Sequence, residues 1–60
     1  MKTGDVITIY QDPITCEKIE DRGKVVKIIK KLSEYNLKGQ QLHRVMVRFP
    51  DGVFERLAAN

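Results

Sequence analysis

Basic side chains are the most chemically distinctive residues of this sequence, because they recur between residues 22 and 56 with few acidic residues among them. The set is Arg22, Lys24, Lys27, Lys30, Lys31, Arg44, Arg48 and Arg56. Lysine and arginine neutralise phosphates, and such contacts make nucleic-acid binding strongly dependent on salt. If these segments form neighbouring strands, alternate side chains would gather on one outer face. We therefore predict a nucleic-acid-binding surface made of Lys24, Lys27, Lys31, Arg44, Arg48 and Arg56.

The formal net charge of +3 conceals an uneven distribution along the 60-residue chain. Residues 1–21 hold two lysines against five acidic residues, which gives −3, and residues 22–60 hold nine basic residues against three acidic ones, which gives +6. A small domain polarised in this way can present a basic face to an anionic partner. Exposed lysines also keep a small sheet soluble and block pairing at its edges, so both explanations stay open.

A protein partner is the alternative to nucleic acid. Four acidic residues, Asp12, Glu17, Glu20 and Asp21, follow Tyr10 in the sequence. Together they could attract a basic peptide through complementary charge. The chain would then serve as a protein–protein interaction module, or as a small accessory or regulatory protein.

Aromatic side chains are sparse, with two tyrosines, two phenylalanines and no tryptophan. Rings that reach the surface of a nucleic-acid-binding protein stack on unpaired bases. We expect Tyr10 and Tyr35 to make such contacts, and Phe54 is the other ring expected near a surface.

The residue types do not predict an enzyme or a bound cofactor. His43 is the sole histidine and Cys16 the sole cysteine, so the usual set of four zinc ligands cannot be assembled from them. Acidic neighbours of Cys16 disfavour a reactive thiolate. The four glycines are spaced as turn residues and not as a phosphate-binding loop.

The length of the chain indicates a single domain over residues 1–60 with a thin core. One cysteine permits no intrachain disulfide, which is typical of a reducing compartment and favours the cytoplasm. No apolar run approaches the roughly 20 residues of a membrane span, so we expect no membrane association. We expect a monomer or a weak dimer.

Four segments have the composition of β-strands, namely residues 5–10, 24–32, 44–49 and 53–57. In the first, Ile7 and Ile9 are expected to point into the core. The second has β-branched residues at four of positions 25–29, which favours a strand over a helical stripe. Residues 11–21 predict a long loop, with a short helix starting at Asp12 as the alternative. Residues 33–43 predict a second long loop.

The last two strands are expected to form a tight hairpin at Pro50-Asp51-Gly52. Proline lacks the N–H that a hydrogen-bonded pair requires, which favours a three-residue loop with Gly52 in a left-handed conformation. That loop would pair Phe49 with Val53 and would gather most apolar side chains on one face. Its further pairs would be Val47 with Glu55 and Val45 with Leu57.

Three blocks of sequence resemble parts of SH3-like barrels. They are Gly-Asp-Val-Ile-Thr-Ile at 4–9, Gly-Lys-Val-Val-Lys-Ile at 23–28 and Val-Met-Val-Arg-Phe-Pro-Asp-Gly at 45–52. The first two blocks are similar to a KOW motif, which occurs in ribosomal proteins and transcription elongation factors that bind RNA or protein. The interval between them is longer here and acidic. The whole pattern also resembles small SH3-like proteins of uncharacterised function from bacterial, phage or mobile-element genomes. These resemblances imply an all-β, SH3-like barrel of four to five antiparallel strands with long first and second loops.

Overall fold

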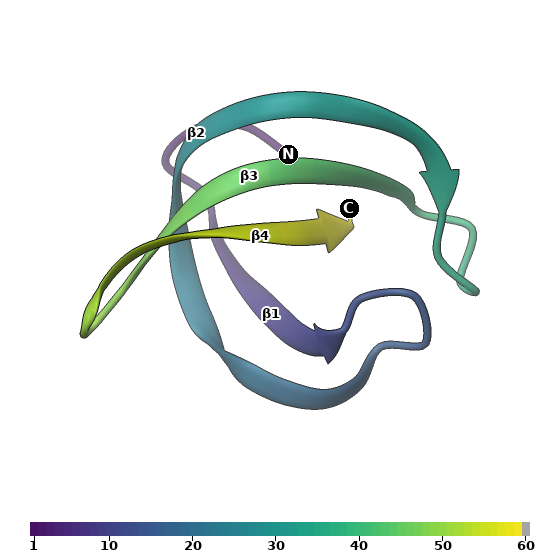
Figure 1. Ribbon diagram of the computed structural model, residues 1–60, viewed down its shortest axis with the longest axis horizontal. Helices are drawn as coiled ribbons and strands as arrows, with labels where there is room; N and C mark the ends of the chain where they lie inside the picture. The colour runs from purple at the N-terminus through teal and green to yellow at the C-terminus, as the bar shows by residue number, and fades with distance from the viewer. Residues whose placement is uncertain (60) are drawn as a thin grey trace.

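The computed structural model describes residues 1–59, which form one antiparallel sheet of four strands. The strands are β1 (Val6–Asp12), β2 (Glu17–Tyr35), β3 (Gln41–Phe49) and β4 (Gly52–Ala59). Their order in the sheet is β1-β2-β3-β4, so each strand pairs with the next one along the chain (Figure 1). The prediction of an all-β chain of antiparallel strands is confirmed. Nowhere in residues 1–59 is there a helix with the length and apolar character needed to span a membrane.

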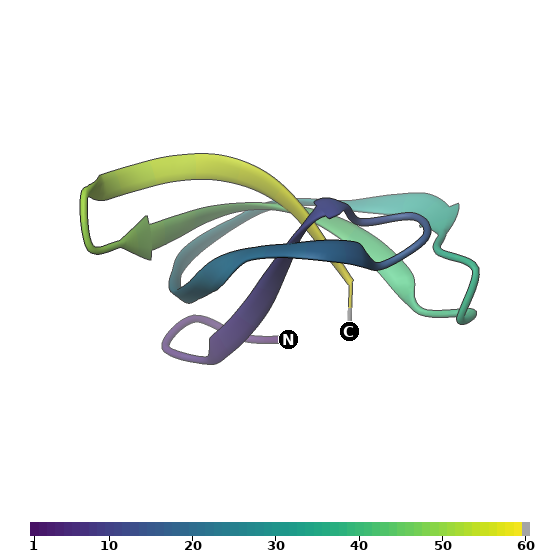
Figure 2. The ribbon, with the colours of Figure 1, turned by 90° about the horizontal axis from the view of Figure 1, so that it is seen from below.

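The long strand β2 belongs to both halves of the molecule. Its first part pairs with β1 and its second part pairs with β3, and the ribbon curves around the other strands between the two (Figures 1 and 2). The pairing skips Glu20 opposite β1, and skips Val26 and Ile29 opposite β3, and the β2–β3 register shifts again between Lys31 and Tyr35. Such bulges and irregularities bend a strand and increase its twist. The curvature of β2 therefore has a local cause at four positions.

The core lies on the concave side of this curved sheet. A buried cluster joins all four strands and consists of Ile9, Val25, Val45, Val47, Phe49 and Ala58. Ile7, Ile28 and Met1 pack against it and are partly buried. The expectation that Ile7 and Ile9 point into the core is confirmed. Each fully buried side chain of this size contributes about 1.5–3 kcal/mol, so a single thin layer supplies most of the stabilisation.

The predicted long loops are wrong, because the strands extend into them. The connections comprise residues 13–16 and 36–40, and residues 17–22 are part of β2. These six residues are all exposed and show no apolar alternation, so the sequence pattern did not indicate a strand here.

The predicted alternative, a short helix starting at Asp12, is also wrong. The carboxylate of Asp12 accepts hydrogen bonds from the backbone N–H groups of Ile14 (3.0 Å) and Thr15 (3.3 Å), which makes a tight turn instead.

The two short connections are joined through Asn36, which is the buried polar residue of the described chain. Its side-chain N–H group donates to Gln40 Oε1 (3.0 Å) and to the Cys16 sulfur (3.5 Å). The backbone N–H of Leu37 donates to the Ile14 carbonyl (2.9 Å). These bonds hold the β1–β2 turn against the β2–β3 turn.

The predicted register of the last hairpin is also wrong. Phe49 pairs with Gly52 and Val47 with Phe54, so the loop is the two residues Pro50 and Asp51. Proline lies in the loop itself, where its missing N–H is not required. The observed register places Arg56 opposite Val45, on the core side. The predicted register was chosen because it gathers apolar residues on one face, so it did not place an arginine on the core side.

Candidate nucleic-acid interface

A basic surface lies on the convex face of the sheet, opposite the core. Lys24 pairs with Arg48 across β2 and β3, and Lys30 pairs with Arg44. Residues directly opposite each other share a face, and the buried Val25 and Val47 alternate with these pairs. Lys27, opposite Met46, lies between the two pairs. We define the basic convex face as Lys24, Lys27, Lys30, Arg44 and Arg48.

The bulges at Val26 and Ile29 of β2 create this arrangement. Lys24, Lys27 and Lys30 are three residues apart, and in a regular strand every second one would point to the opposite face. The bulge at Val26 adds one residue between the first two lysines, and the bulge at Ile29 does the same between the next two. Each extra residue compensates for the odd spacing between two lysines, so all three lysines point outward.

The charges of the basic convex face are largely unmatched. Among residues 1–59, the one ion pair of this face joins Arg44 Nε to Glu55 Oε2 at 3.8 Å, between side chains that are about half exposed. Lys24 faces Arg48 and Lys30 faces Arg44, so two like-charged pairs lie directly across from each other. Such pairs destabilise a sheet. The face therefore concentrates positive charge at a cost to the fold.

The structure brings together four of the six predicted basic residues: Lys24, Lys27, Arg44 and Arg48. Lys31 pairs with His43 and points to the other side of the ribbon, while Arg56 lies on the core side of β4. Lys30 takes the position on the convex face that the alternation assigned to Lys31. The repeated spacing of three residues in Lys24, Lys27 and Lys30 was the available signal, and it required recognition of the bulges.

Among residues 1–59, no aromatic ring takes part in the cross-strand pairs of the basic convex face. Tyr10 lines a pocket together with Arg44 of this face and with Glu20, Glu55 and Arg56. Tyr35 is exposed but lies at the far end of β2, opposite Gln41. Phe54 pairs with Val47 on the core side. Of the two predicted aromatic residues, Tyr10 thus lies beside the Arg44 end of the basic convex face, and Tyr35 lies apart from it.

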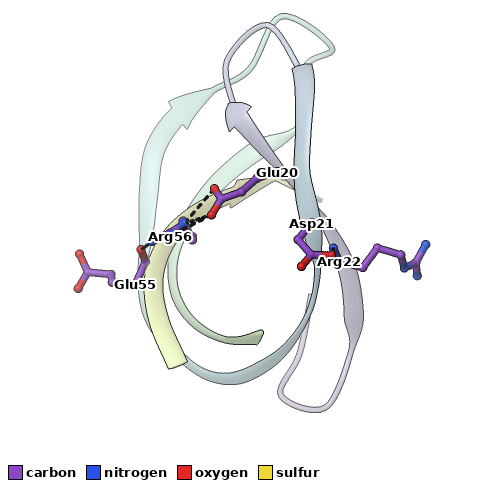
Figure 3. Close-up of polar contacts among 5 residues, drawn as sticks. All are labelled: Glu20, Asp21, Arg22, Glu55 and Arg56. Carbon is purple, nitrogen blue, oxygen red and sulfur yellow. Dashed lines mark hydrogen bonds and ion pairs between the residues drawn. The ribbon is translucent and has the colours of Figure 1, made fainter. Parts of the chain in front are cut away.

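A second charged region joins β2 to β4, which are not neighbours in the sheet, and we call it the seam: Glu20 of β2 and Arg56 of β4. Arg56 Nε lies 3.1 Å from both carboxylate oxygens of Glu20, and Nη2 lies 2.7 Å from Oε1 (Figure 3). The guanidinium also lies 5.4 Å from the ring centres of both Phe49 and Phe54. Glu20 is the residue skipped in the β1–β2 pairing, and a bulge can redirect a side chain in this way.

The seam alters the acid–base properties of both partners. The hydrogen bonds from Arg56, followed by its charge, hold the pKa of Glu20 below its usual value. The same contact raises the pKa of Arg56. Both side chains are about one third exposed, so solvent screens part of this interaction.

The acidic N-terminal segment has internal partners for several of its carboxylates. Glu20 is bound by Arg56, and Asp12 accepts the two backbone hydrogen bonds of its own turn. Those bonds, from Thr15 first and then Ile14, lower the pKa of Asp12. Asp21 Oδ1 accepts from the backbone N–H of Arg22 at 2.7 Å (Figure 3). Less of this segment is free to attract a basic peptide than the sequence indicates.

The remaining candidates for chemistry are isolated from one another. His43 Nδ1 lies 3.2 Å from the Gln41 carbonyl, in β3. Cys16 lies in the β1–β2 turn beside Asn36. Within residues 1–59, no group of three or more histidine, cysteine, aspartate or glutamate side chains is placed to hold a metal ion.

Comparison with known proteins returned no significant match to a protein-family model, a characterised protein or a solved structure.

Proposed function

We propose that this chain is a non-enzymatic binding module that associates with nucleic acid through the basic convex face. The observation that carries the proposal is the placement of Lys24 directly across from Arg48 and of Lys30 directly across from Arg44, with Lys27 between them. A polyanion that lies along the face would offset the repulsion within both pairs.

Solubility alone explains this arrangement less well. A lysine or arginine keeps a sheet soluble wherever it is exposed, and an acidic residue opposite it would remove the repulsion without loss of polarity. Four of the five cations instead lack an ion-pair partner among residues 1–59. A surface whose cations lack ion-pair partners is suited to binding phosphates. Neutralisation of the phosphates releases the counterions bound to the nucleic acid, which favours association.

The fold class is proposed together with the function. The resemblance of residues 4–9, 23–28 and 45–52 to SH3-like barrels is supported by the strongly bent β2, which is shared between two halves of the sheet. An experimental structure in which β1 and β4 lie far apart would contradict this assignment.

Binding of a fluorescein-labelled nucleic acid, followed by anisotropy at several salt concentrations, tests the functional proposal. The variant K24Q/K27Q/R48Q removes three positive charges from the basic convex face. We expect its affinity to fall on the order of tenfold or more at low salt. The slope of log K against log salt should become shallower by about 0.9 for each duplex phosphate that the variant no longer neutralises.

The matched control is K2Q/K31Q/K38Q, which removes the same charge from exposed lysines outside this face. It should keep most of the affinity. An equal fall in affinity in both variants would mean that net charge alone attracts the nucleic acid, and no binding by the wild type at low salt would refute the proposal. Either result would make a protein partner the better hypothesis.

A further inference from the structure

We infer that the nucleic acid recognised by the basic convex face is double-stranded and that its bases are not contacted by stacking. This inference rests on the proposed function and specifies its ligand. Three independent features of the face support it: the absence of aromatic rings from its cross-strand pairs among residues 1–59, its curvature and the extent of its cations.

Single-stranded ligands are normally held by several rings that stack on successive unpaired bases. Within residues 1–59, the cross-strand pairs of this face contain no ring, and Tyr10 is a single ring in a pocket beside Arg44 at one end of the face. The side chains opposite three of the cations are aliphatic or thioether groups: Val6 lies opposite Lys24, Val53 opposite Arg48, and Met46 opposite Lys27. In the described chain, the one acidic partner of these cations is Glu55, which forms an ion pair with Arg44. None of these provides a flat surface for a base. Both phenylalanines are already in contact with Arg56, and Phe49 is buried.

The curvature of the sheet also disfavours a single strand. Proteins that bind single strands without sequence preference enclose the backbone in a basic groove. Here the cations lie on the outward-curving side of β2 and β3, so a flexible strand would be contacted from one side only. The stiff backbone of a duplex can contact a convex surface without being enclosed.

The extent of the face agrees with a duplex contact. Arg44 and Arg48 are four residues apart, which corresponds to roughly 13 Å along an extended strand. A duplex advances about 3.4 Å along its axis for each phosphate of one strand, so the five cations can reach several phosphates at once. Four to five such contacts predict a slope of log K against log salt of about −4.

Four labelled probes of equal length separate the possibilities: a duplex DNA, a duplex RNA, a thymine single strand and an abasic single strand. Anisotropy titrations of the full chain should show both duplexes bound at least tenfold more tightly than either single strand. The thymine and abasic strands should bind equally, within about twofold, because the bases add nothing. Both Y35A and Y10A should leave every affinity unchanged, whereas K27Q should weaken duplex binding.

Several outcomes would overturn the inference while leaving the proposed function intact. These are a duplex preference below tenfold, tighter binding of the thymine strand than of the abasic strand, and a fall in single-strand affinity in Y35A or Y10A. Failure of all four probes to bind at low salt would instead refute the proposed function itself.

Discussion

The basic convex face and the seam use charge in opposite ways on the same sheet. In the seam, the guanidinium of Arg56 meets both oxygens of one carboxylate and two aromatic rings. On the convex face, Lys24 and Lys30 each meet another cation. The seam is thus arranged to hold β4 against the first part of β2. The convex face retains a repulsion between Lys24 and Arg48 that no ion pair among residues 1–59 offsets, and this repulsion is the physical basis of the proposed binding.

Gly23 supports both regions, and its substitution should have the largest effect. It is buried where β2 passes from β1 to β3, and a Cβ there would overlap the Val47 side chain and approach the Phe49 ring. We expect G23A to lower the free energy of unfolding by about 3 kcal/mol, as overpacking does in a core. Urea denaturation followed by circular dichroism measures the change.

Gly39 provides the control for Gly23, because a Cβ there meets nothing within 4 Å although φ is +79°. Backbone strain alone should make G39A cost about 1–2 kcal/mol. If G39A destabilised the chain more than G23A, the close approach of β2 to β3 at Gly23 would not be a real constraint.

Removal of Arg56 should have the next largest effect. The ion pair contributes about 0.2–1 kcal/mol and the contact with the rings about 0.5–1 kcal/mol, so R56A should cost roughly 1–2 kcal/mol. The matched variant R44A removes the looser pair with Glu55 and should cost under about 0.5 kcal/mol. Equal destabilisation of the two variants by urea would remove the distinction between the two regions.

Acid should weaken the seam by protonating Glu20. The pKa of Glu20 is lowered in the folded chain, so its contribution to stability is fully present above the usual value of 4.5 and disappears as the pH falls through the lowered value. The stability difference between the wild type and E20Q should therefore shrink on acidification. Asp12 remains in both proteins, so its own titration cancels. A difference that stayed constant from about pH 6 to about pH 2 would contradict this prediction.

Reversal of a charge on the convex face should have the smallest effect on stability, and it should stabilise the fold, whereas the variants above destabilise it. K24E places a carboxylate opposite Arg48, and replacement of a like-charged pair by an ion pair should stabilise the fold by about 0.2–1 kcal/mol. The same change should weaken nucleic-acid binding. K31E, opposite His43, serves as the control and should do neither. Thermal denaturation and anisotropy measure the two effects, and a destabilised K24E would mean that the repulsion is already relieved.

The sequence predicted the buried parts of the strands well, because alternation of apolar residues reports burial directly. Ile9, Val45 and Val47 follow that rule and lie in the core. It failed for residues 17–22, where the strand is paired but exposed. It also failed for the hairpin register, because Arg56 lies on the core side for reasons that involve Glu20, 36 residues away.

The candidate site was predicted in part for a related reason. Lys24, Lys27, Arg44 and Arg48 are basic residues of predicted strands, and composition was sufficient to identify them. The choice of Lys31 over Lys30 followed from strict alternation, which the bulge at Ile29 interrupts. Bulges leave little trace in composition, so their positions and the faces that follow from them had to come from the structure.

The bulges at Val26 and Ile29 also make the length of β2 adjustable at these two positions. Deletion of Val26 would remove one bulge, and Lys27 would still pair with Met46 and Ile28 with Val45, because the deleted residue has no partner in β3. The strand would become more regular and less bent, while Lys27 and Lys30 kept their outward faces. We expect folded homologues to tolerate the loss of one residue at either position. A deletion variant at Val26 that failed to fold would contradict this expectation.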